Sequence, residues 1–546
     1  MNTLQNVKIT VDAGKIIGDL EHNWRYIGYD ENNYTYTPEG KEMLSRFGIL
    51  EDAPYYIRAH HMLCTGNMHG VYKWGSTNAY IEDRQGNPVY NWEVVDEILD
   101  TYLDNNCKPF FEIGFMPYHL VDPKCFDGLS DWEKYNEYRR LFWAYPPKDY
   151  RKWYDLVYKL VRHCVEKYGE NEVLTWYWEL WNEPDIFYWR GTHEEYCKLF
   201  DYTEAAVHAA LDGARLGGPA TTDPRPGSKS LKFLEDFLDH CANGVNHVTG
   251  KKGTRLDFVT FHTKGGGFRF DVDAPKMTPS VKKQVSQVKT GLEAIKKYGY
   301  GDLEVVLSEA DPDGWAAGGI YDNKNLNFRN TEYYASYVAC SYNNIERVAR
   351  SMNAAVKPLA WAFIFVGERC FEGTRTFATQ GINKAVFNLF KMYAKMGNRE
   401  LSFRSSHEID VLKYKDEFGR GEDPDISGMA SVSGDGSIQV LVYSHHDDWD
   451  IEKEYDVELD ICNISTMENA SIRHYRIDKE HSNAYTEWKR QGSPKYPSKE
   501  QYEAIKGKDG LELFEPDKNI RVIDGKIKVE FKMPTHAVSL IEITRA

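Results

Sequence analysis

Long apolar runs are missing from the sequence, and this excludes a membrane-spanning helix, which needs roughly 20 consecutive apolar residues. The first residues, Met-Asn-Thr-Leu-Gln-Asn-Val-Lys, also lack the apolar centre of a secretory signal. The nine cysteines are scattered, without CxxC pairs or clusters spaced with histidine, so neither a disulfide framework nor a zinc site is indicated. We therefore expect a cytoplasmic protein with reduced thiols.

Positive charge is also in deficit. The chain has 67 lysine and arginine residues against 83 aspartate and glutamate residues, a formal net charge of −16. This balance argues against nucleic acid or an anionic membrane as a partner. Aromatic residues, in contrast, reach 14% of the chain. Many should lie in the core, but such richness also suits carbohydrate binding. The sequence leaves open whether the chain forms a homo-oligomer.

The length of 546 residues is too great for one small core and favours two domains. Between residues 21 and 398, strand-like runs alternate with helical patterns; 148–169, for example, has apolar residues at helical spacing and ends at a glycine. The expected strands are 24–29, 54–61, 108–116, 175–182, 214–219, 256–263, 303–309 and 358–366, and the expected helices are 38–48, 91–106, 148–169, 193–213, 228–242, 280–298, 330–349 and 384–397. This alternation favours a (β/α)8 TIM barrel, an α/β fold, over a doubly wound sheet.

After residue 400 the pattern changes to short apolar runs separated by turn residues. The runs are 438–444, 455–462, 470–476, 519–523, 526–532 and 537–543. They predict a C-terminal β-sandwich domain over 399–546, following a barrel domain over 21–398. Residues 1–20 contain a β-like segment at 7–11 that is a candidate to join the sandwich. Residues 415–430, rich in Asp, Glu and Gly, are expected to form an exposed loop.

One stretch of the expected barrel, Thr-Trp-Tyr-Trp-Glu-Leu-Trp-Asn-Glu-Pro-Asp (175–185), combines apolar and reactive residues. Its first half is typical of a buried strand, and Pro184 ends that strand. Asn182 and Glu183 therefore lie at the carboxyl end of a barrel strand, where such barrels keep their chemistry. The alternative is a loop carboxylate that caps the next helix.

Other polar residues follow the expected strands in the same way. Because the carboxyl ends of barrel strands share one face, residues far apart in the sequence can converge there. The second strand leads to Arg58, His60 and His61, the sixth to His262 and Lys264, the seventh to Glu309 and Asp311, and the eighth to Glu368, Glu372 and Arg375.

Glu183 and Glu309, at the ends of the fourth and seventh strands, would suffice as the core of a glycosidase. One carboxyl protonates the leaving oxygen while the other attacks the sugar or activates water. We expect Glu183 to be the acid/base, its pKa kept high by its partner's charge and by aromatic enclosure, and Glu309 to be the nucleophile. A covalent intermediate requires the carboxyls to lie about 5–5.5 Å apart. Considered alone, Glu309 would be better explained as a solvated loop acid after an apolar strand.

Several segments resemble glycoside hydrolase family 39, which contains β-xylosidases and α-L-iduronidases. They are 112–117, 146–153, Trp-Asn-Glu-Pro at 181–184, 216–220 and 475–489, so the resemblance runs through nearly the whole chain. It implies a TIM barrel with a β-sandwich, retention of configuration, and no metal or other cofactor. It also implies that Glu183 is the acid/base, Glu309 the nucleophile and Asn182 the partner of the sugar 2-hydroxyl.

Some details are similar to iduronidases rather than to xylosidases. These are Phe-His-Thr-Lys-Gly (261–265), Glu-Ala-Asp-Pro-Asp-Gly-Trp (309–315) and Thr-Arg-Thr (374–376). Lys264 and Arg375 would bind a uronate carboxylate through charge-assisted contacts, or would instead pair with carboxylates of the protein itself. On this match the substrate-binding residues are His60, Asn182, His262, Lys264, Trp315 and Arg375, with Glu368 as a candidate ligand of sugar hydroxyls.

The glycone is ambiguous because an α-L-iduronide shares its configuration at C1 to C4 with a β-D-xyloside. One pair of glutamates could therefore serve both. We expect a retaining exo-glycosidase acting on short oligosaccharides or glycosides as a β-D-xylosidase, with an α-L-iduronidase-like enzyme as the alternative. A catalytically silent carbohydrate-binding barrel is a third interpretation, disfavoured because both glutamates are present.

Overall fold

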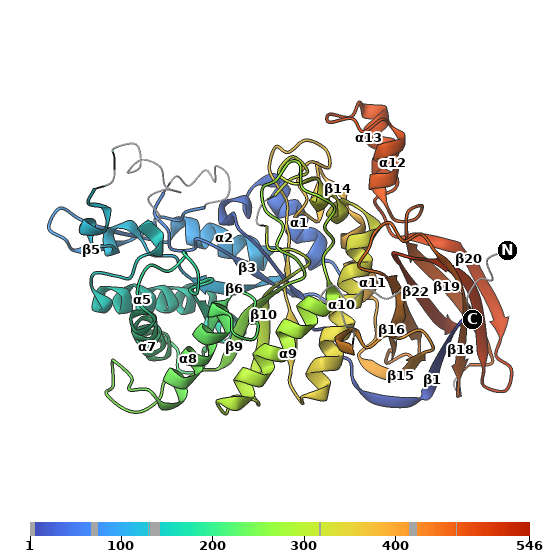
Figure 1. The fold of residues 1–546 in the computed structure, drawn as a ribbon, viewed down its shortest axis with the longest axis horizontal. Coiled ribbons are helices and arrows are strands. Elements are labelled where there is room, and N and C mark those ends of the chain that lie inside the picture. Colours follow the sequence, from blue (N-terminus) through green and yellow to red (C-terminus); the bar gives the residue numbers. More distant parts are fainter. Residues whose placement is uncertain are drawn as a thin grey trace.

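The computed structural model describes residues 6–66, 75–128, 130, 142–315, 318–413, 423–465 and 467–546. It contains a parallel barrel and a second, mostly antiparallel sheet, which lie beside each other (Figure 1). The barrel comprises the blue to yellow part of the chain, and the second sheet comprises mainly the orange to red part. Within the described ranges, no helix is both long and apolar enough to cross a bilayer.

The nine strands of the barrel sheet are parallel and follow the chain order around the barrel. β11 pairs with β10 and β12 pairs with β2, so residues 356–361 form the eighth barrel strand in two pieces and nearly close the sheet. The strands are β2 (Tyr26–Tyr29), β3 (Tyr55–Ala59), β6 (Cys107–Ile113), β7 (Tyr177–Leu180), β8 (Arg215–Thr221), β9 (Phe258–Lys264), β10 (Glu304–Asp311), β11 (Val356–Pro358) and β12 (Ala360–Trp361). The predicted TIM barrel is confirmed.

Helices cover the outside of the barrel (Figure 1). In α5 (Tyr150–Tyr168) the side chain of Asp149 caps the first turn by accepting hydrogen bonds from the N–H groups of Arg151 and Lys152, and Trp153 and Leu160 are buried. Gly169, at φ +87°, ends this helix in the left-handed conformation that glycine tolerates. The other longer helices described around the barrel are α1 (Pro38–Gly48), α2 (Glu93–Asp104), α7 (His193–Ala210), α8 (Lys229–Asn243), α9 (Val281–Lys297), α10 (Glu332–Ser351) and α11 (Ala385–Ala394), and α6 (Glu170–Val173) is a single turn.

Aromatic side chains close the barrel toward the amino ends of its strands. Inward-facing positions alternate along each strand, so the layers inside the barrel repeat every second residue. Tyr26, Phe110, Tyr177 and Phe258 belong to one buried cluster. The layer two residues further along β3, β6 and β7 is charged and buried, and it contains Arg58, Glu112 and Glu179.

The second sheet has nine strands in the order β20-β19-β22-β17-β16-β15-β1-β18-β21. Its strands are β1 (Asn6–Asp19), β15 (Arg399–Ser405), β16 (Asp425–Val432), β17 (Ile438–His445), β18 (Glu454–Cys462), β19 (Asn469–Ile477), β20 (Glu512–Arg521), β21 (Ile527–Pro534) and β22 (Ala537–Arg545). Side chains from β1, β17, β18, β21 and β22 enclose one apolar core, as in a sandwich. The predicted combination of a barrel and a C-terminal sandwich is confirmed.

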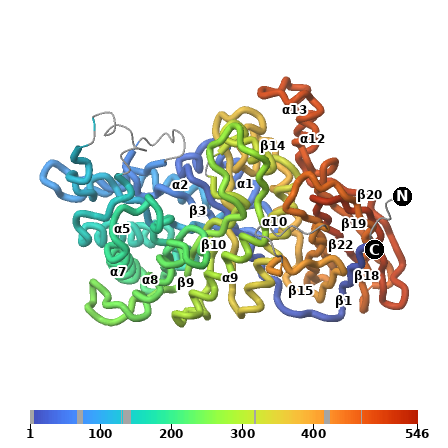
Figure 2. The backbone as a smooth tube through the Cα atoms, viewed as in Figure 1, coloured from blue at the N-terminus to red at the C-terminus, as the bar shows by residue number. Residues whose placement is uncertain are grey.

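β1 lies inside this sheet, antiparallel to β15 and parallel to β18. Figure 2 shows it in blue beside the orange and red strands, from which the chain continues to the barrel. The domain boundaries themselves, at residues 20 and 398, remain a prediction.

The prediction of an exposed loop at 415–430 is wrong for the residues of this segment that the structure describes. Residues 425–430 belong to β16, whose burial the small residues Ser427 and Gly428 conceal in the sequence. A Cβ at Gly428 would lie 1.9 Å from the carbonyl oxygen of Leu441 on β17, so only glycine allows this close approach. Residues 414–422 lie outside the described ranges. β15 and the helices α12 (Ala484–Arg490) and α13 (Lys499–Lys506) were not predicted either.

The barrel and the second sheet share an apolar interface. Leu441 and Tyr443 of β17 and Val538 and Leu540 of β22 belong to the same buried cluster as the barrel core. α10 packs against both of these strands. The two units are therefore joined by core packing.

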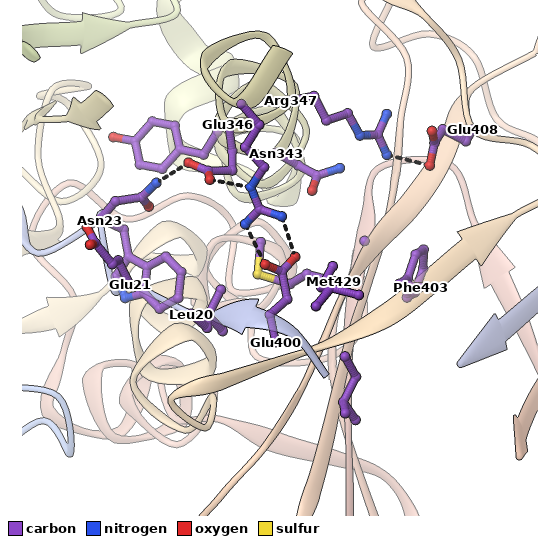
Figure 3. Close-up of a pocket in the computed structure, with 16 residues that line it drawn as sticks. Leu20, Glu21, Asn23, Asn343, Glu346, Arg347, Glu400, Phe403, Glu408 and Met429 are labelled. Carbon is purple, nitrogen blue, oxygen red and sulfur yellow. Dashed lines mark hydrogen bonds and ion pairs between the residues drawn. The ribbon is translucent and has the colours of Figure 1, made fainter. Parts of the chain in front are cut away.

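A cavity of about 240 Å³ lies at the same junction (Figure 3). Arg350 of α10 pairs there with Glu346 one turn earlier and with Glu400 of β15. Arg347 pairs with Glu408, and Asn23, before β2, donates to Glu346. Ion pairs that cross from helix to sheet therefore accompany the apolar contact.

Candidate active site

The fourth and seventh barrel strands bring Glu183 and Glu309 to the same end of the barrel. Glu183 follows β7, and Glu309 lies in the last part of β10. The backbone at Trp181 (φ +70°) and Glu183 (φ +45°) is left-handed, a conformation that costs of order 1–3 kcal/mol and persists only where neighbours hold it. The N–H of Glu183 donates to the carbonyl of Ala220, 2.8 Å away, just within β8. The neighbouring strand thus fixes this turn.

The two carboxylates are close to each other. An oxygen of Glu183, an oxygen of Glu309 and a ring nitrogen of His262 all lie within 4.8 Å of one another. Inverting glycosidases separate their carboxyls by roughly 6.5–9.5 Å, because a water molecule must fit between the base carboxylate and the sugar. The short separation is compatible with attack by one carboxylate on a sugar that the other protonates. The roles of the two groups remain a prediction.

Glu183 has the properties of an acid near neutral pH. Burial, followed by the negative charge of Glu309, raises the pKa of its carboxyl to about 7. Its side chain keeps 16% exposure, so a substrate can reach it. The Nδ1 atom of His262 lies 3.0 Å from Glu183 Oε1, and burial lowers the pKa of that imidazole to about 3. His262 is therefore neutral and orients the Glu183 carboxyl without adding charge.

Glu309 is held in the ionised form. Burial alone would raise the pKa of its carboxyl, but the surrounding positive charges, Lys264 first, lower it well below the usual range. The ammonium of Lys264 lies 2.6 Å from Oε2, and guanidinium nitrogens of Arg58 and Arg375 lie 3.5 and 3.6 Å from the carboxylate. Two carboxyl groups in one pocket thus differ in protonation because cations surround only one of them closely.

Arg58 is buried and organises the layer beneath these glutamates. Its guanidinium contacts Glu179 at 2.6 Å and Glu112 at 3.0 Å. It also donates to the side-chain oxygen of Asn182 at 3.0 Å. Because Arg58 holds that oxygen, the amide N–H₂ of Asn182 is the part left to meet a sugar hydroxyl.

His60 is charged. Burial alone would lower the pKa of its imidazole, but the charge of Glu112, whose carboxylate lies 2.6 Å from Nδ1, outweighs burial and raises the pKa to about 9. Its Nε2 atom lies 3.4 Å from Glu309 and 3.5 Å from Asp30. His60 therefore adds a further positive charge next to Glu309.

Lys264 and Arg375 both face carboxylates of the protein. Lys264 pairs with Asp311 at 2.8 Å in addition to Glu309. Arg375 contacts Asp30 at 3.4 Å and Asp311 at 3.5 Å. Of the two interpretations of these cations, pairing within the protein therefore describes this structure.

Two further glycone contacts were predicted, Trp315 and Glu368. Trp315 follows β10 and is half-buried, and its backbone N–H donates to Asp313. Glu368 accepts a hydrogen bond from the N–H of Gly373 at 2.8 Å and lines a different cavity. Among the described residues, neither side chain forms a hydrogen bond or ion pair with Glu183 or Glu309.

The site also depends on residues that sequence reasoning did not single out as binding groups. Asp30, Glu112, Glu179 and Asp311 all pair with cations next to the predicted carboxylates. A usable signal was present for two of them. Glu112 and Glu179 lie two residues after inward aromatic residues, Phe110 and Tyr177, which places them one layer nearer the active face.

Two groups of side chains in the described part of the chain have donors suited to a metal ion. One is Glu183, His262 and Glu309, where the ammonium of Lys264 already pairs with Glu309. The other is Asp201, His240 and His247, away from this site. There the Asp201 carboxylate is hydrogen-bonded to both imidazoles, at 2.9 and 2.8 Å, and to Thr254. These hydrogen bonds explain the second cluster without an ion.

Known proteins match this chain across both the barrel and the second sheet. The sequence model of glycosyl hydrolases family 39 covers residues 7–511. A β-xylosidase of Geobacillus stearothermophilus is 26% identical over 525 residues, which is 92% of this chain and 89% of that protein. The α-L-iduronidase of Mus musculus is 24% identical over 77% of this chain and 63% of its own length.

Among solved structures, a monomeric β-xylosidase from Caulobacter crescentus superimposes with a TM-score of 0.76 at 21% identity, over 98% of this chain and 99% of that one. At this level of identity the structural likeness supports the fold, and the match to the family model extends it to the chemistry.

Proposed function

Because the chain belongs to the glycosyl hydrolases of family 39, we propose that it is a retaining exo-glycosidase that removes a terminal β-D-xylosyl residue from a short oligosaccharide or glycoside. The observation that carries the retaining mechanism is the close pair of carboxyls with opposite protonation, Glu183 with its pKa raised to about 7 and Glu309 with its pKa lowered.

The reaction proceeds by double displacement. The Glu309 carboxylate attacks C1 of the sugar, the bond between C1 and the leaving oxygen breaks, and Glu183 gives its proton to that oxygen. This leaves a glycosyl ester on Glu309 and a carboxylate on Glu183. Glu183 then takes a proton from a water molecule, which attacks C1 from the side that the leaving group left, and Glu309 is released. The two inversions give net retention.

The charge of the pocket supports a neutral glycone. Lys264 and Arg375 already face Glu309, Asp311 and Asp30, so the protein supplies its own counter-ions. A uronate carboxylate would have to compete with these carboxylates and would add another negative charge beside Glu309. A xyloside, which has no charge, meets no such penalty.

An α-L-iduronide is the second candidate substrate, and one observation favours it. The contacts of Arg375 are all 3.4–3.6 Å long, compared with 2.6–2.8 Å for Lys264. A guanidinium held this loosely could turn toward a carboxylate of the sugar. The similarity to the mouse iduronidase points the same way.

We further propose that the enzyme acts in the cytoplasm on short glycosides. All nine cysteines are free, and most of them are buried. Free thiols in this number are typical of proteins that work in a reducing compartment.

A panel of 4-nitrophenyl glycosides tests the proposal. We expect the kcat/KM for the β-D-xyloside to exceed that for the α-L-iduronide, and the first product to be the β-anomer of xylose, detected by proton NMR. Faster hydrolysis of the iduronide would replace the proposed substrate. Binding of sugars without turnover of any glycoside would instead favour a silent barrel.

A further inference from the structure

The loop after β8 places one further carboxylate at the active face of the barrel. β8 pairs with β7, which leads to Glu183, and with β9, which carries His262 and Lys264. Asp223 is the second residue after the end of β8. It therefore follows the strand that lies between those of the proposed acid/base and of the histidine that orients it. In addition to burial and the charge of Glu309, the charge of Asp223 raises the pKa of Glu183.

The position of Asp223 is fixed by the side-chain amide of Gln287, a buried residue of α9. The Gln287 Nε2 atom donates to Asp223 Oδ2 at 3.0 Å and to the carbonyl of Lys264 at 3.1 Å. Its Oε1 atom accepts from the N–H of Lys264 at 2.7 Å. Arg225 Nε lies 3.0 Å from the same Oδ2 atom of Asp223. One glutamine thus ties this carboxylate to the strand that carries Lys264.

The loop after β7 is joined to the loop after β8 by Asp185. The Asp185 carboxylate accepts hydrogen bonds from the N–H of Thr222, at 2.8 Å, and from the Thr222 hydroxyl. Thr222 directly precedes Asp223, and Asp185 is two residues after Glu183. Glu183 and Asp223 therefore lie on adjoining loops that are hydrogen-bonded to each other.

One oxygen of Asp223 is left for a ligand. The contacts of Gln287 and Arg225 both go to Oδ2, and no described residue donates to Oδ1. The Oδ1 atom also has accessible surface, in a side chain that is 21% exposed. This oxygen can therefore accept a hydrogen bond from a molecule bound at the active face.

The exposure of the side chains indicates on which side of the substrate Asp223 lies. Glu309 and Lys264 are 6% and 9% exposed, whereas Glu183 is 16% and Asp223 is 21% exposed. The proposed nucleophile is thus the more enclosed glutamate, and the sugar that it attacks occupies the enclosed part of the site. The leaving group lies beside the acid that protonates it. Asp223, close to Glu183 and more open to solvent, is therefore on the side of the leaving group.

We propose that Asp223 is a specificity-determining residue, whose Oδ1 atom accepts a hydrogen bond from a hydroxyl of the leaving sugar. The inference rests on the proposed function, since it requires a glycoside substrate with Glu183 as the acid. A hydroxyl that donates to a carboxylate forms a short, strong hydrogen bond. An aglycone without hydroxyls cannot form it, so the enzyme prefers xylobiose and other xylo-oligosaccharides to alkyl xylosides.

Two substrates that both need a proton on the leaving oxygen separate recognition of the aglycone from acid catalysis. Xylobiose carries hydroxyls on its leaving sugar, whereas cyclohexyl β-D-xyloside releases a ring alcohol without any others. We expect Asp223→Ala to lower kcat/KM for xylobiose by about 10- to 100-fold more than for the cyclohexyl xyloside, the range of one hydrogen bond to a charged acceptor. Asp212→Ala, just before β8 at the opposite end of the barrel and 99% exposed, is the matched control and should keep the unmodified ratio.

A second variant, Asp223→Asn, keeps the contacts of the loop. Gln287 and Arg225 are both donors, so they hold the amide oxygen and turn the N–H₂ group toward the sugar. The same selective loss on xylobiose is therefore expected, and this variant decides if Asp223→Ala is inactive on both substrates. Removing the charge should also move the alkaline limb of the pH profile on an aryl xyloside to lower pH, because that charge raises the pKa of Glu183.

Three results would overturn this role of Asp223. They are an equal loss on both substrates, no loss on either substrate, and an alkaline limb that does not move in Asp223→Asn. Turnover of 4-nitrophenyl β-D-xyloside by the unmodified enzyme reports the proposed function separately. An enzyme that hydrolyses this xyloside, but whose substrate ratio is the same in both Asp223 variants, refutes the inference and leaves the proposed function standing.

Discussion

Glu183 and Glu309, whose carboxylate oxygens approach within 4.8 Å, differ in protonation because of a few neighbouring atoms. Lys264, Arg58 and His60 contact Glu309, whereas Glu183 meets a neutral histidine. Charge placed on one side of the pair lowers one pKa, and the resulting carboxylate raises the other. This asymmetry gives each residue a separate, measurable function.

Removing each glutamate in turn should separate these functions. We expect Glu309→Ala to abolish turnover of every glycoside, because nothing replaces the nucleophile. Glu183→Ala should lose about 10²–10⁴-fold in rate on substrates with poor leaving groups, and far less on an aryl glycoside with a very acidic phenol, which needs no proton. Azide should rescue Glu183→Ala and yield a β-glycosyl azide. Equal losses on the activated substrate would show that the roles are wrongly assigned.

Lys264→Met should move both limbs of the pH profile of kcat/KM to higher pH. The cation lowers the pKa of Glu309 and that of Glu183, so its removal raises both. The acid limb follows ionisation of Glu309, and the alkaline limb follows loss of the Glu183 proton near pH 7 in the unmodified enzyme.

The same variant tests the glycone on a paired substrate set. If Lys264 bound a uronate, Lys264→Met would weaken transition-state binding of the iduronide by about 2–5 kcal/mol and would leave that of the xyloside unchanged. On our proposal the xyloside and the iduronide change in parallel. A profile that does not shift would show that the ammonium of Lys264 does not control the two glutamates.

At this scale the sequence predicted most of the positions that converge. Glu183, Asn182, His262, Lys264 and Glu309 lie together because each follows a barrel strand, and strand ends can be recognised from apolar runs. The partners of these residues could not be predicted, since Arg58 meets Glu179 across 121 positions of the chain. Glu368 was placed by resemblance, and in the structure it lines a cavity of about 520 Å³ whose lining does not include Glu183 or Glu309.

Among the elements, the closure of the barrel depends on one close approach. Trp361 at the end of β12 crosses Gly28 of β2, where an added Cβ would lie 2.3 Å from the indole and 2.9 Å from the carbonyl of Arg58. The same indole contacts the ring of His60 at a tilt of 40°, with ring centroids 4.5 Å apart. The packing of the last strand on the first therefore reaches the active site.

Gly28→Ala should lower both the stability and the activity of the enzyme. Overpacking at a rigid contact typically costs about 1–3 kcal/mol, so the free energy of unfolding in urea should fall by that amount. Activity should also fall, because the displaced indole of Trp361 would shift the imidazole of His60. Gly18→Ala in β1 is the control, because nothing lies within 4 Å of its added Cβ. Equal stability of the two variants would mean that Trp361 moves aside freely.

Elements with a clear period were predicted well. All eight expected helices and all eight expected barrel strands are present, because apolar periodicity and caps carry that information. β16 was missed because its buried residues other than Ile426 are small or polar, and such residues resemble those of a loop. α12 and α13 are short and partly exposed, so their sequences contain little apolar pattern.

For the whole molecule, the shared core makes the two units dependent on each other. Leu441, Tyr443, Val538 and Leu540 complete the barrel's buried cluster from the second sheet. A chain ending near residue 400 would expose the face of α10 that they cover and would also leave β1 without β18. We expect such a fragment to be insoluble or to bind a hydrophobic dye when expressed, in contrast to the full chain. A soluble barrel fragment that hydrolyses an aryl glycoside would show that the units fold independently.

The position of β1 has a consequence for how the protein is made. β1 emerges from the ribosome before the barrel strands, yet one of its two neighbours, β18, begins about 435 residues later. At 5–20 residues per second this is a wait of roughly 20–90 s. Until β15 follows the barrel, β1 has an unpaired edge on both sides, and the edge that pairs with β18 stays open for longer. Translation speed and chaperone access during this interval should therefore decide how much of the nascent chain becomes active enzyme.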